Sequence, residues 1–304
     1  MKLSIVTTMY YSRNYLDEFY KRTLAVVKEL DLSYEFVFID DGSPDDSLMV
    51  ALGLQNKDHN IKVVELSKNF GHQKAIMTGL QYAKGDFVFL IDCDLEEDPE
   101  LLKEFWEVRG QDVDSVYGVQ VKRKGGWFER VSGRLFYKIV NILSAVKYPA
   151  DTLTARVMSR RYVDALLKFQ EKELDLWSIF AIAGFKQISV NVKKGYKGLS
   201  TFTLKKKIKR AIEVITSFSH RPLYLTFIFG IISFVVALIN VSLIAYDKFF
   251  LGVDVEGWAS IMASVWLIGG MLFLVLGVFS IYLSKMFLEI KNRPLTIVRN
   301  VHTK

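Results

Sequence analysis

The sequence predicts an α/β protein built on a doubly wound, mainly parallel sheet, followed by a C-terminal part that associates with a membrane. Short apolar runs alternate with helical patterns through the first two thirds of the chain, and strands that alternate with helices form parallel βαβ units. The last third carries two long apolar stretches, and each exceeds the roughly 20 residues that a helix needs to cross the hydrocarbon core of a bilayer.

The chain is too long for one small domain and too apolar for an ordinary soluble enzyme. The chain has 304 residues, of which 51% are hydrophobic, and a formal net charge of +7. Its mean hydropathy is +0.20. The single cysteine, Cys93, excludes an internal disulfide and any cysteine zinc cluster. We therefore expect the catalytic part to face a reducing compartment.

The expected strands are short runs of apolar, often β-branched or aromatic residues bounded by turn residues. They cover residues 2–8, 35–40, 61–66, 87–92, 113–118 and 187–192, and residues 151–157 are expected to be extended. The first run lacks the apolar core of a signal peptide and is interrupted by threonines, so we interpret it as the first strand. No Gly-x-Gly-x-x-Gly motif follows it, so the dinucleotide-binding fingerprint is missing.

The expected helices lie between these strands, and two of them show apolar residues at helical spacing most clearly. They cover residues 13–30, a segment from residue 45, and residues 71–83, 127–146, 160–169 and 175–183. Each follows a strand or precedes the next one, as the crossovers of a parallel sheet require.

The fourth strand and the acidic residues after it are the most informative stretch. Its apolar run leads directly into Asp92, Asp94 and Glu96 at alternate positions. Parallel strands present their carboxyl ends to the ligand crevice, and alternate residues of an extended chain face one side. If the chain stays extended, three carboxylates share one side, and such oxygen ligands suit Mg²⁺ or Mn²⁺. The alternative is an acidic turn before a helix that begins at Asp98-Pro99.

Two apolar stretches, residues 223–246 and 258–286, are expected to span the membrane as a hairpin within residues 222–286. Basic residues flank the pair on both outer sides, whereas the loop between them is short and mostly acidic. The positive-inside rule places both flanks in the cytoplasm. We therefore expect an integral protein of the cytoplasmic (inner) membrane with two spans and with the catalytic domain and both termini cytosolic. Two buried helices of a soluble domain are the alternative.

Residues 203–221 are expected to form a basic amphipathic helix at the membrane interface. Its apolar residues recur at spacings of three and four residues, and lysines with Arg210 fill the opposite face. This pattern is typical of a helix that lies along anionic lipid. Nucleic acid is not expected as a partner, because the run lacks an interleaved aromatic platform. The domains are then residues 1–202, 203–221, 222–286 and a basic cytosolic tail, 287–304.

Four motifs stand in the order that one family shows: DDGSPD at residues 40–45, NFGHQKA at 69–75, DCDLEEDP at 92–99 and SFSHRPL at 217–223. On these motifs the chain resembles the family 2 glycosyltransferases of the polyprenyl-phosphate type, such as dolichol-phosphate mannosyltransferase and the bactoprenol glucosyltransferases. The resemblance covers nearly the whole chain. It implies a GT-A fold, a nucleotide-sugar donor, Mg²⁺ or Mn²⁺, and a polyprenyl phosphate as acceptor.

The resemblance also implies roles on the donor side. Asp40 and Asp41 are expected to hold the base and ribose, and three further residues are expected at the nucleotide: Thr8, Tyr10 and Lys74. Asp92, Asp94 and Glu96 are expected to bind the metal, with Asp92 also at the nucleotide diphosphate and Asp94 catalytic. Thr8 stands where many relatives have proline, and Glu96 where they often have glutamine.

On the acceptor side the resemblance implies a catalytic pair and a set of phosphate-binding residues. Asp151 and Arg156 match the family's Asp-Phe-Arg-Leu region, in which the aspartate orients the arginine or the acceptor. The residues expected at the acceptor phosphate are Arg123, Lys193, Lys197 and Ser200. For the aspartate a turn or N-cap role is the alternative, and for the lysines it is contact with lipid head groups.

The expected function is inverting transfer of a sugar from a donor such as UDP-glucose to undecaprenyl (bactoprenol) phosphate, for cell-surface glycan modification. A metal stabilises the leaving diphosphate as a Lewis acid, and the acceptor phosphate is already an anion. Two alternatives remain open: a glycosyltransferase acting on another lipid or a polysaccharide, and a non-catalytic membrane protein that binds nucleotide sugars. A homo-oligomer formed through the membrane segment also remains open.

Overall fold

The computed structural model describes residues 1–110, 112–120, 152–192, 216, 219, 221–250 and 257–303. The chain divides into two compact units. The first consists of Met1–Tyr137, Lys147–Thr203 and Asn292–Lys304 and holds the sheet. The second consists of Lys138–Val146 and Leu204–Lys291 and holds two long helices. The expected helices at residues 127–146 and 203–221 lie almost entirely outside the described residues.

The first unit is organised around one sheet of eight strands in the order β7-β5-β6-β4-β1-β2-β3-β8. The strands are β1 (Lys2–Met9), β2 (Ser33–Asp40), β3 (Ile61–Leu66), β4 (Phe87–Leu90), β5 (Ser115–Gln120), β6 (Thr152–Ser159), β7 (Gln187–Val192) and β8 (Val298–His302). Strand β1 pairs in parallel with β2 and β4, β2 with β3, and β5 with β7, whereas β6 and β8 run antiparallel to their neighbours. The expected mainly parallel sheet is confirmed.

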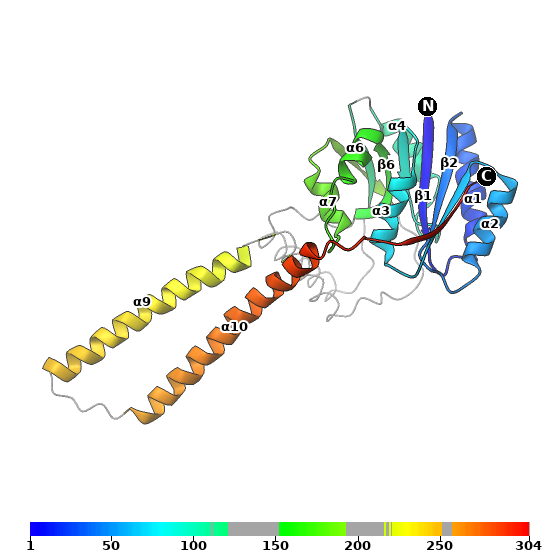
Figure 1. The fold of residues 1–304 in the computed structure, drawn as a ribbon. Coiled ribbons are helices and arrows are strands. Elements are labelled where there is room, and N and C mark those ends of the chain that lie inside the picture. The colour runs from blue at the N-terminus through cyan, green and yellow to red at the C-terminus, as the bar shows by residue number, and fades with distance from the viewer. Residues whose placement is uncertain are drawn as a thin grey trace. The chain divides into compact units, whose positions relative to one another are not determined.

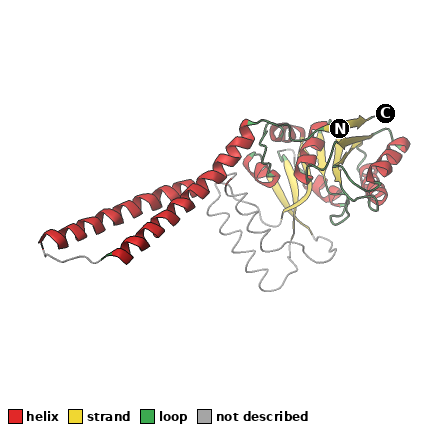
Figure 2. Ribbon diagram, turned by 60° about the horizontal axis from the view of Figure 1, so that its bottom comes forward, coloured by secondary structure: helices red, strands yellow, loops and turns green. Residues whose placement is uncertain are grey.

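Helices cover both faces of the sheet (Figures 1 and 2). One face packs against α1 (Leu16–Glu29), α2 (Ser47–Lys57) and α4 (Leu101–Val108). The other packs against α3 (His72–Tyr82), α6 (Arg160–Leu166) and α7 (Leu176–Ile182). Because helices shield both faces, the central strands are apolar almost continuously. Strand β2, for example, is buried from Glu35 through Asp40.

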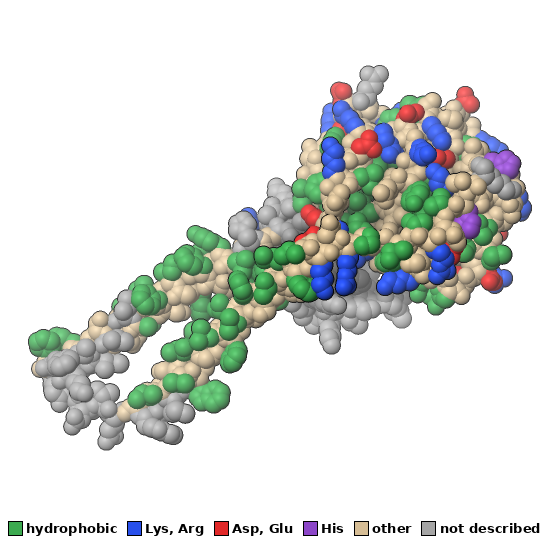
Figure 3. Space-filling view, viewed as in Figure 1, with side chains coloured by type: hydrophobic (Ala, Val, Ile, Leu, Met, Phe, Trp, Pro, Cys, Tyr) green, Lys and Arg blue, Asp and Glu red, His purple; other side chains and the backbone are tan. Residues whose placement is uncertain are grey.

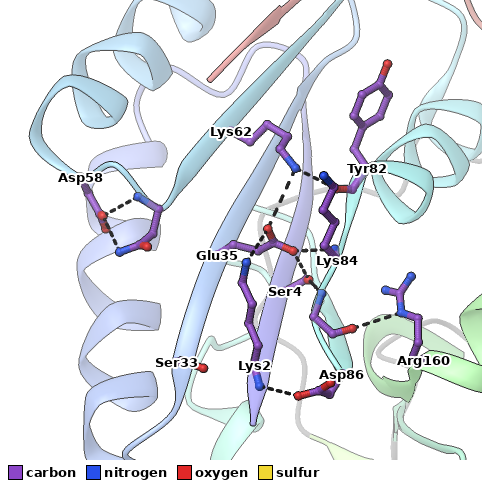
Figure 4. A network of polar contacts seen from close by, with 12 residues as sticks. Lys2, Ser4, Ser33, Glu35, Asp58, Lys62, Tyr82, Lys84, Asp86 and Arg160 are labelled. Atoms are coloured by element: carbon purple, nitrogen blue, oxygen red, sulfur yellow. Dashed lines mark hydrogen bonds and ion pairs between the residues drawn. The ribbon is translucent and has the colours of Figure 1, made fainter. Parts of the chain in front are cut away.

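A polar network fastens the end of the sheet where the parallel strands begin (Figure 4). The Glu35 carboxylate, 7% exposed, accepts hydrogen bonds from the hydroxyl of Ser4 at 2.6 Å and from Nζ of Lys2 at 3.1 Å. It also accepts one from the backbone N–H of Lys84. Burial raises the pKa of Glu35, but these hydrogen bonds outweigh it and hold the pKa below its usual value. The network joins β1, β2 and the entry to β4, and it leaves the opposite strand ends for a site.

The sequence expectations differ from the structure mainly at strand ends and edges. Strand β4 ends at Leu90, two residues before the expected end, because the chain turns after it. The segment 287–304, expected only as a basic tail, contains β8, which pairs with β3 at the edge of the sheet. A second anchor accompanies this strand, since the hydroxyls of Thr78 and Thr296 lie 2.7 Å apart.

The second unit contains α9 (Arg221–Phe250) and α10 (Trp258–Ile290), whose surfaces carry many apolar side chains (Figure 3). Within the described residues, one helix, Ser264–Ile290, is long and apolar enough to cross a membrane, and none of its most apolar window is buried. A second apolar helical segment, Arg221–Ala237, is shorter. One helix of spanning length is therefore present, and the two-span hairpin stays a prediction.

Candidate active site

The predicted donor-side residues gather where β1, β2 and β4 end. The ladders align Thr8 with Ile39 and Met9 with Asp40 at the ends of β1 and β2. Asp92 follows β4, which pairs with β1 on its other side. The fold therefore brings the ends of these three strands together at one edge of the sheet, the usual ligand edge of an open α/β sheet.

Asp41 fixes the loop that leads into α3. Its carboxylate is 2% exposed and accepts hydrogen bonds from the backbone N–H groups of Phe70 at 2.7 Å and Gly71 at 3.0 Å. Burial raises the pKa of Asp41, although these two hydrogen bonds oppose the shift. The loop so held places half-buried Lys74 in the first turn of α3. A helix N-terminus with a lysine suits an anionic ligand.

The turn after Asp41 requires glycine. Gly42 has a φ of +63°, and a Cβ at this position would lie 2.6 Å from the backbone nitrogen of Asn69. Only a residue without a side chain lets the turn after β2 approach the Asn69 loop this closely. The expected nucleotide residue Asp40 precedes this turn, is 3% exposed, and accepts a hydrogen bond from the Ser43 N–H at 3.3 Å.

Two exposed tyrosines extend from the end of β1. Tyr10 and Tyr11 are 47% and 61% exposed, and their rings meet edge to face with centroids 4.8 Å apart. Tyr11 has a φ of +56°, a conformation that costs a bulky residue free energy. The Ser43 hydroxyl supports it by accepting a hydrogen bond from its backbone N–H at 2.8 Å. Tyr11 was not among the predicted site residues, because only the family position of Tyr10 pointed to a nucleotide.

Asp92 is held on both carboxylate oxygens. Oδ2 accepts a hydrogen bond from the Thr154 hydroxyl at 2.8 Å, and Oδ1 lies 3.4 Å from Nε2 of His72. The other ring nitrogen of the histidine, Nδ1, lies 3.0 Å from the Thr8 hydroxyl. A threonine in place of proline at position 8 thus supplies a partner for the ring. His72 and Thr154 were missed, since a lone histidine in a loop and a threonine in a strand carry no signal in the sequence.

The condition under which Asp92, Asp94 and Glu96 would share one side is not met, because the chain does not stay extended after β4. Leu95 has a φ of +59°, and Oδ1 of Asp94 accepts a hydrogen bond from the Glu96 N–H at 3.0 Å, closing a tight turn. The period-two alternation of a strand ends there. Across the described parts of the chain no group of three His, Cys, Asp or Glu side chains is arranged to hold a metal ion.

Arg156 lies in β6, paired with Leu90 and Tyr117, and is 1% exposed. Its guanidinium stacks 3.6 Å from the ring centre of Phe180 and borders a cavity of about 210 Å³. Burial lowers the pKa of this guanidinium to about 10, which leaves it charged near neutral pH. Its present contacts are with the protein itself, so the expected catalytic contact with substrate stays a prediction.

The remaining predicted residues lie outside the part of the chain that the structure describes. They are Asp151, Arg123, Lys193, Lys197 and Ser200. The expected acceptor side of the site is therefore untested by the geometry, whereas the expected donor side is described in full.

The carboxyl edge of the mostly parallel sheet combines carboxylates with a helix N-terminus, an arrangement that suits a ligand with phosphate groups. The family model described as "Glycosyl transferase family 2" matches residues 4–167. The chain belongs to this family, so it is a glycosyltransferase and its sheet is GT-A-like.

Curated relatives align with the chain over nearly its whole length. A protein of Mycobacterium tuberculosis (strain CDC 1551 / Oshkosh) named among "putative glycosyltransferases" is 41% identical over 303 residues, 99% of this chain and 89% of the relative. The bactoprenol glucosyl transferase of Shigella phage SfII is 28% identical over 99% of both chains. The undecaprenyl-phosphate 4-deoxy-4-formamido-L-arabinose transferase of Sodalis glossinidius is 27% identical over 99% of this chain and 94% of its own.

Proposed function

We propose that the protein transfers a sugar from a nucleotide-sugar donor, such as UDP-glucose, to a polyprenyl phosphate, such as undecaprenyl phosphate. The observation that carries this proposal is the end-to-end similarity to two relatives whose names contain bactoprenol and undecaprenyl-phosphate. The similarity includes the C-terminal part with its long apolar helix, so it extends beyond the sheet that binds donors. The product is a lipid-linked sugar for modifying cell-surface glycans.

The donor side of the proposal rests on the carboxyl edge of the sheet. Asp40 and Asp41 receive the base and ribose, with Tyr10 offering an exposed aromatic face for stacking. Lys74 at the start of α3, together with backbone N–H groups, faces the negative charge of the diphosphate. Thr8 contributes indirectly, because its hydroxyl contacts His72 rather than standing alone.

A divalent metal fits the residues present, in the manner in which Mg²⁺ is usually bound beside phosphates. One or two carboxylates plus substrate phosphate oxygens complete such a site, and Asp92 and Asp94 are carboxylates at the end of β4. We propose these two as metal ligands, with Glu96 as a third that needs a rearrangement of the turn at Leu95. The metal, Mg²⁺ or Mn²⁺, would supply Lewis-acid stabilisation of the leaving diphosphate.

The acceptor side completes the reaction with a single displacement. An oxygen of the polyprenyl phosphate forms a bond to the anomeric carbon while the bond from that carbon to the nucleotide diphosphate breaks, so the configuration inverts. The phosphate is already anionic near neutral pH, and a strong general base is unnecessary. Asp151 orients either Arg156 or the acceptor, and four residues draw the acceptor phosphate to the site: Arg123, Lys193, Lys197 and Ser200.

The membrane part of the proposal brings the acceptor to the enzyme. A lipid phosphate stays in the head-group plane, and the apolar helix Ser264–Ile290 supports an enzyme that stays there too. We propose two spans with a cytosolic catalytic domain in the inner membrane, and a basic interfacial segment at residues 203–221 that rests on anionic lipid.

The test is transfer by the full chain in lipid nanodiscs. A panel of nucleotide sugars is supplied with undecaprenyl phosphate, with Mg²⁺, with Mn²⁺ or with a chelator, and products are identified by mass spectrometry. We expect one donor to give a sugar-phosphate lipid only when metal is present, and NMR to report an inverted anomeric centre. Donor binding without transfer to any lipid or polysaccharide would support the non-catalytic alternative instead, and a retained configuration would refute inversion.

A further inference from the structure

Strand β6 contains a bulge beside the candidate site. Tyr117 of β5 pairs with Arg156, but the next pair joins Val119 with Thr152, so residues 153–155 of β6 all lie opposite Gly118. On the other side, the ladder between β4 and β6 ends at the pair Leu90 and Arg156. A bulge leaves backbone groups without ladder partners, and such groups need other partners when they are buried.

Two buried side chains of opposite charge supply these partners. The carboxylate of Glu97, 2% exposed, accepts hydrogen bonds from the N–H groups of Thr154 at 3.2 Å and Ala155 at 2.7 Å. The guanidinium of Arg156 donates to the carbonyl oxygens of Leu153 at 3.1 Å and Thr154 at 3.3 Å. Backbone donors and acceptors of the bulge are thus capped from both sides, and charge-assisted hydrogen bonds are the stronger kind.

The bulge presents one side chain to the site. The hydroxyl of Thr154, at the centre of the capped segment, donates to Oδ2 of Asp92 at 2.8 Å. Glu97 itself lies in the chain just after the acidic turn, so it also ties that turn to β6. His72 lies beside Oδ1 of Asp92, and the contact at Oδ2 depends on the position of Thr154, which in turn depends on Glu97 and Arg156.

We propose that Thr154, Glu97 and Arg156 are positioning residues that orient Asp92 for the donor. Neither charged residue needs to touch substrate for this, which accounts for an arginine that is 1% exposed in a strand. The inference rests on the proposed function only in taking Asp92 as a donor-site residue. It deepens that proposal by assigning Arg156 to the support of the donor side, where the family resemblance had suggested only the acceptor.

The first experiment removes the hydroxyl alone. Thr154→Val is compared with Thr154→Ser, which keeps the hydroxyl, and with Thr23→Val, a matched loss of a buried hydroxyl that bonds Phe19 within α1. Donor affinity is measured by calorimetry on the full chain in detergent with metal present and no acceptor. Losing one hydrogen bond to a charged group should weaken donor binding roughly 10-fold to 100-fold. We expect that loss in Thr154→Val only.

The second experiment tests the support of the bulge. Glu97→Gln and Arg156→Lys keep size while weakening the caps, and each is combined with Thr154→Val. Glu97→Gln and Arg156→Lys should each bind donor more weakly than wild type. Because both residues act through Thr154, each double variant should bind donor no more weakly than Thr154→Val alone. In transfer assays the single variants should change KM for the donor and kcat/KM more than KM for the lipid.

The inference would be overturned if Thr154→Val bound donor as tightly as Thr23→Val. It would also be overturned if the loss of donor affinity in a double variant equalled the product of the two single losses, or if Thr154→Ser bound donor as weakly as Thr154→Val. Thermal unfolding of every variant is recorded, so a loss of binding that follows only a loss of folding also counts against it. The proposed function fails separately, if wild-type protein binds a nucleotide sugar but transfers it to no polyprenyl phosphate.

Discussion

Asp40 and Glu65 are direct partners in the parallel ladder of β2 and β3, yet the pKa values of their carboxyl groups are shifted in opposite directions. Burial raises the pKa of Asp40 to about 6, and the charges of Glu65, Asp41 and Asp45 add to the shift. Burial also acts on Glu65, but hydrogen bonds from Asn300 and Arg299 outweigh it, so the pKa of Glu65 lies below its usual value. Strand β8 thus sets the charge next to the candidate nucleotide site.

Asp40→Asn should stabilise the protein above pH 6. A carboxyl whose pKa is about 6 in the fold and about 4 in the unfolded chain binds its proton more tightly when folded, so stability falls as pH rises between these values. The variant removes this penalty, which amounts to about 2 to 3 kcal/mol at pH 7.5. The gain should shrink toward zero near pH 4. Thermal unfolding in detergent across this pH range measures it.

The control for that series is Asp17→Asn, which changes an exposed carboxyl group on α1. A pH-independent difference between Asp40→Asn and wild type would contradict the raised pKa of Asp40.

A chain that ends at Lys291 should lose stability in the sheet domain, because β3 then becomes an uncovered edge. The loss includes the ladder of β8 and the ion pair in which Nη1 of Arg299 lies 2.8 Å from Oε1 of Glu65. Arg299 is more than half exposed, so Arg299→Ala alone should cost only about 0.5 to 1 kcal/mol. Hydrogen exchange of β3 and the midpoint of thermal unfolding measure the effects of the truncation and of Arg299→Ala. The control is Arg293→Ala, which changes an exposed residue outside β8. Unchanged exchange in β3 after truncation would refute the role of β8.

Tyr10→Leu should weaken nucleotide binding roughly 10-fold, since stacking of a base on an aromatic ring contributes about 1 to 3 kcal/mol. Tyr10→Phe keeps the ring and should bind nucleotide as well as wild type. The measurement is calorimetry with the nucleoside diphosphate of the best donor. If the phenylalanine variant binds as weakly as the leucine variant, the hydroxyl rather than the ring face makes the contact.

Asp94→Asn should abolish transfer and leave the fold intact. The residue lies on the acidic turn beyond β4, and Asn can still accept the hydrogen bond that Oδ1 receives from the Glu96 N–H. Loss of a metal carboxylate should cost several kcal/mol, roughly three or more orders of magnitude in rate. Turnover near that of wild type with Mg²⁺ present would contradict the assignment of Asp94 as a metal ligand. The midpoint of thermal unfolding serves as the control for folding.

The sequence predicted the sheet core well because its pattern is local. Continuous apolar runs mark β1, β2 and β4 as strands buried on both faces, and the turn chemistry of Asp40, Asp41 and Gly42 marks where β2 ends. Acidic residues after two such strands were therefore recognisable as neighbours at one edge, without any structure.

The missed features depend on contacts between distant segments. Glu97 and Thr154 are 57 residues apart, and only the pairing of β4 with β6 brings them together. The turn at Leu95 adopts a backbone conformation that β propensity disfavours, so simple alternation predicted the wrong geometry for Asp94 and Glu96. Strand β8 is short, exposed and charged, as edge strands often are, and such composition is typical of a tail as well.

The order of the strands along the chain has a consequence for synthesis. Strand β7 forms one edge of the sheet and β8 the other, and α9 and α10 lie between them in the chain. The ribosome must therefore deliver both long apolar helices before the eighth strand exists. Until then the β3 edge, with Glu65 lacking Arg299 and Asn300, stays open. Completion of the sugar-transferring domain is thus tied to the later steps of translation, after the apolar helices have emerged.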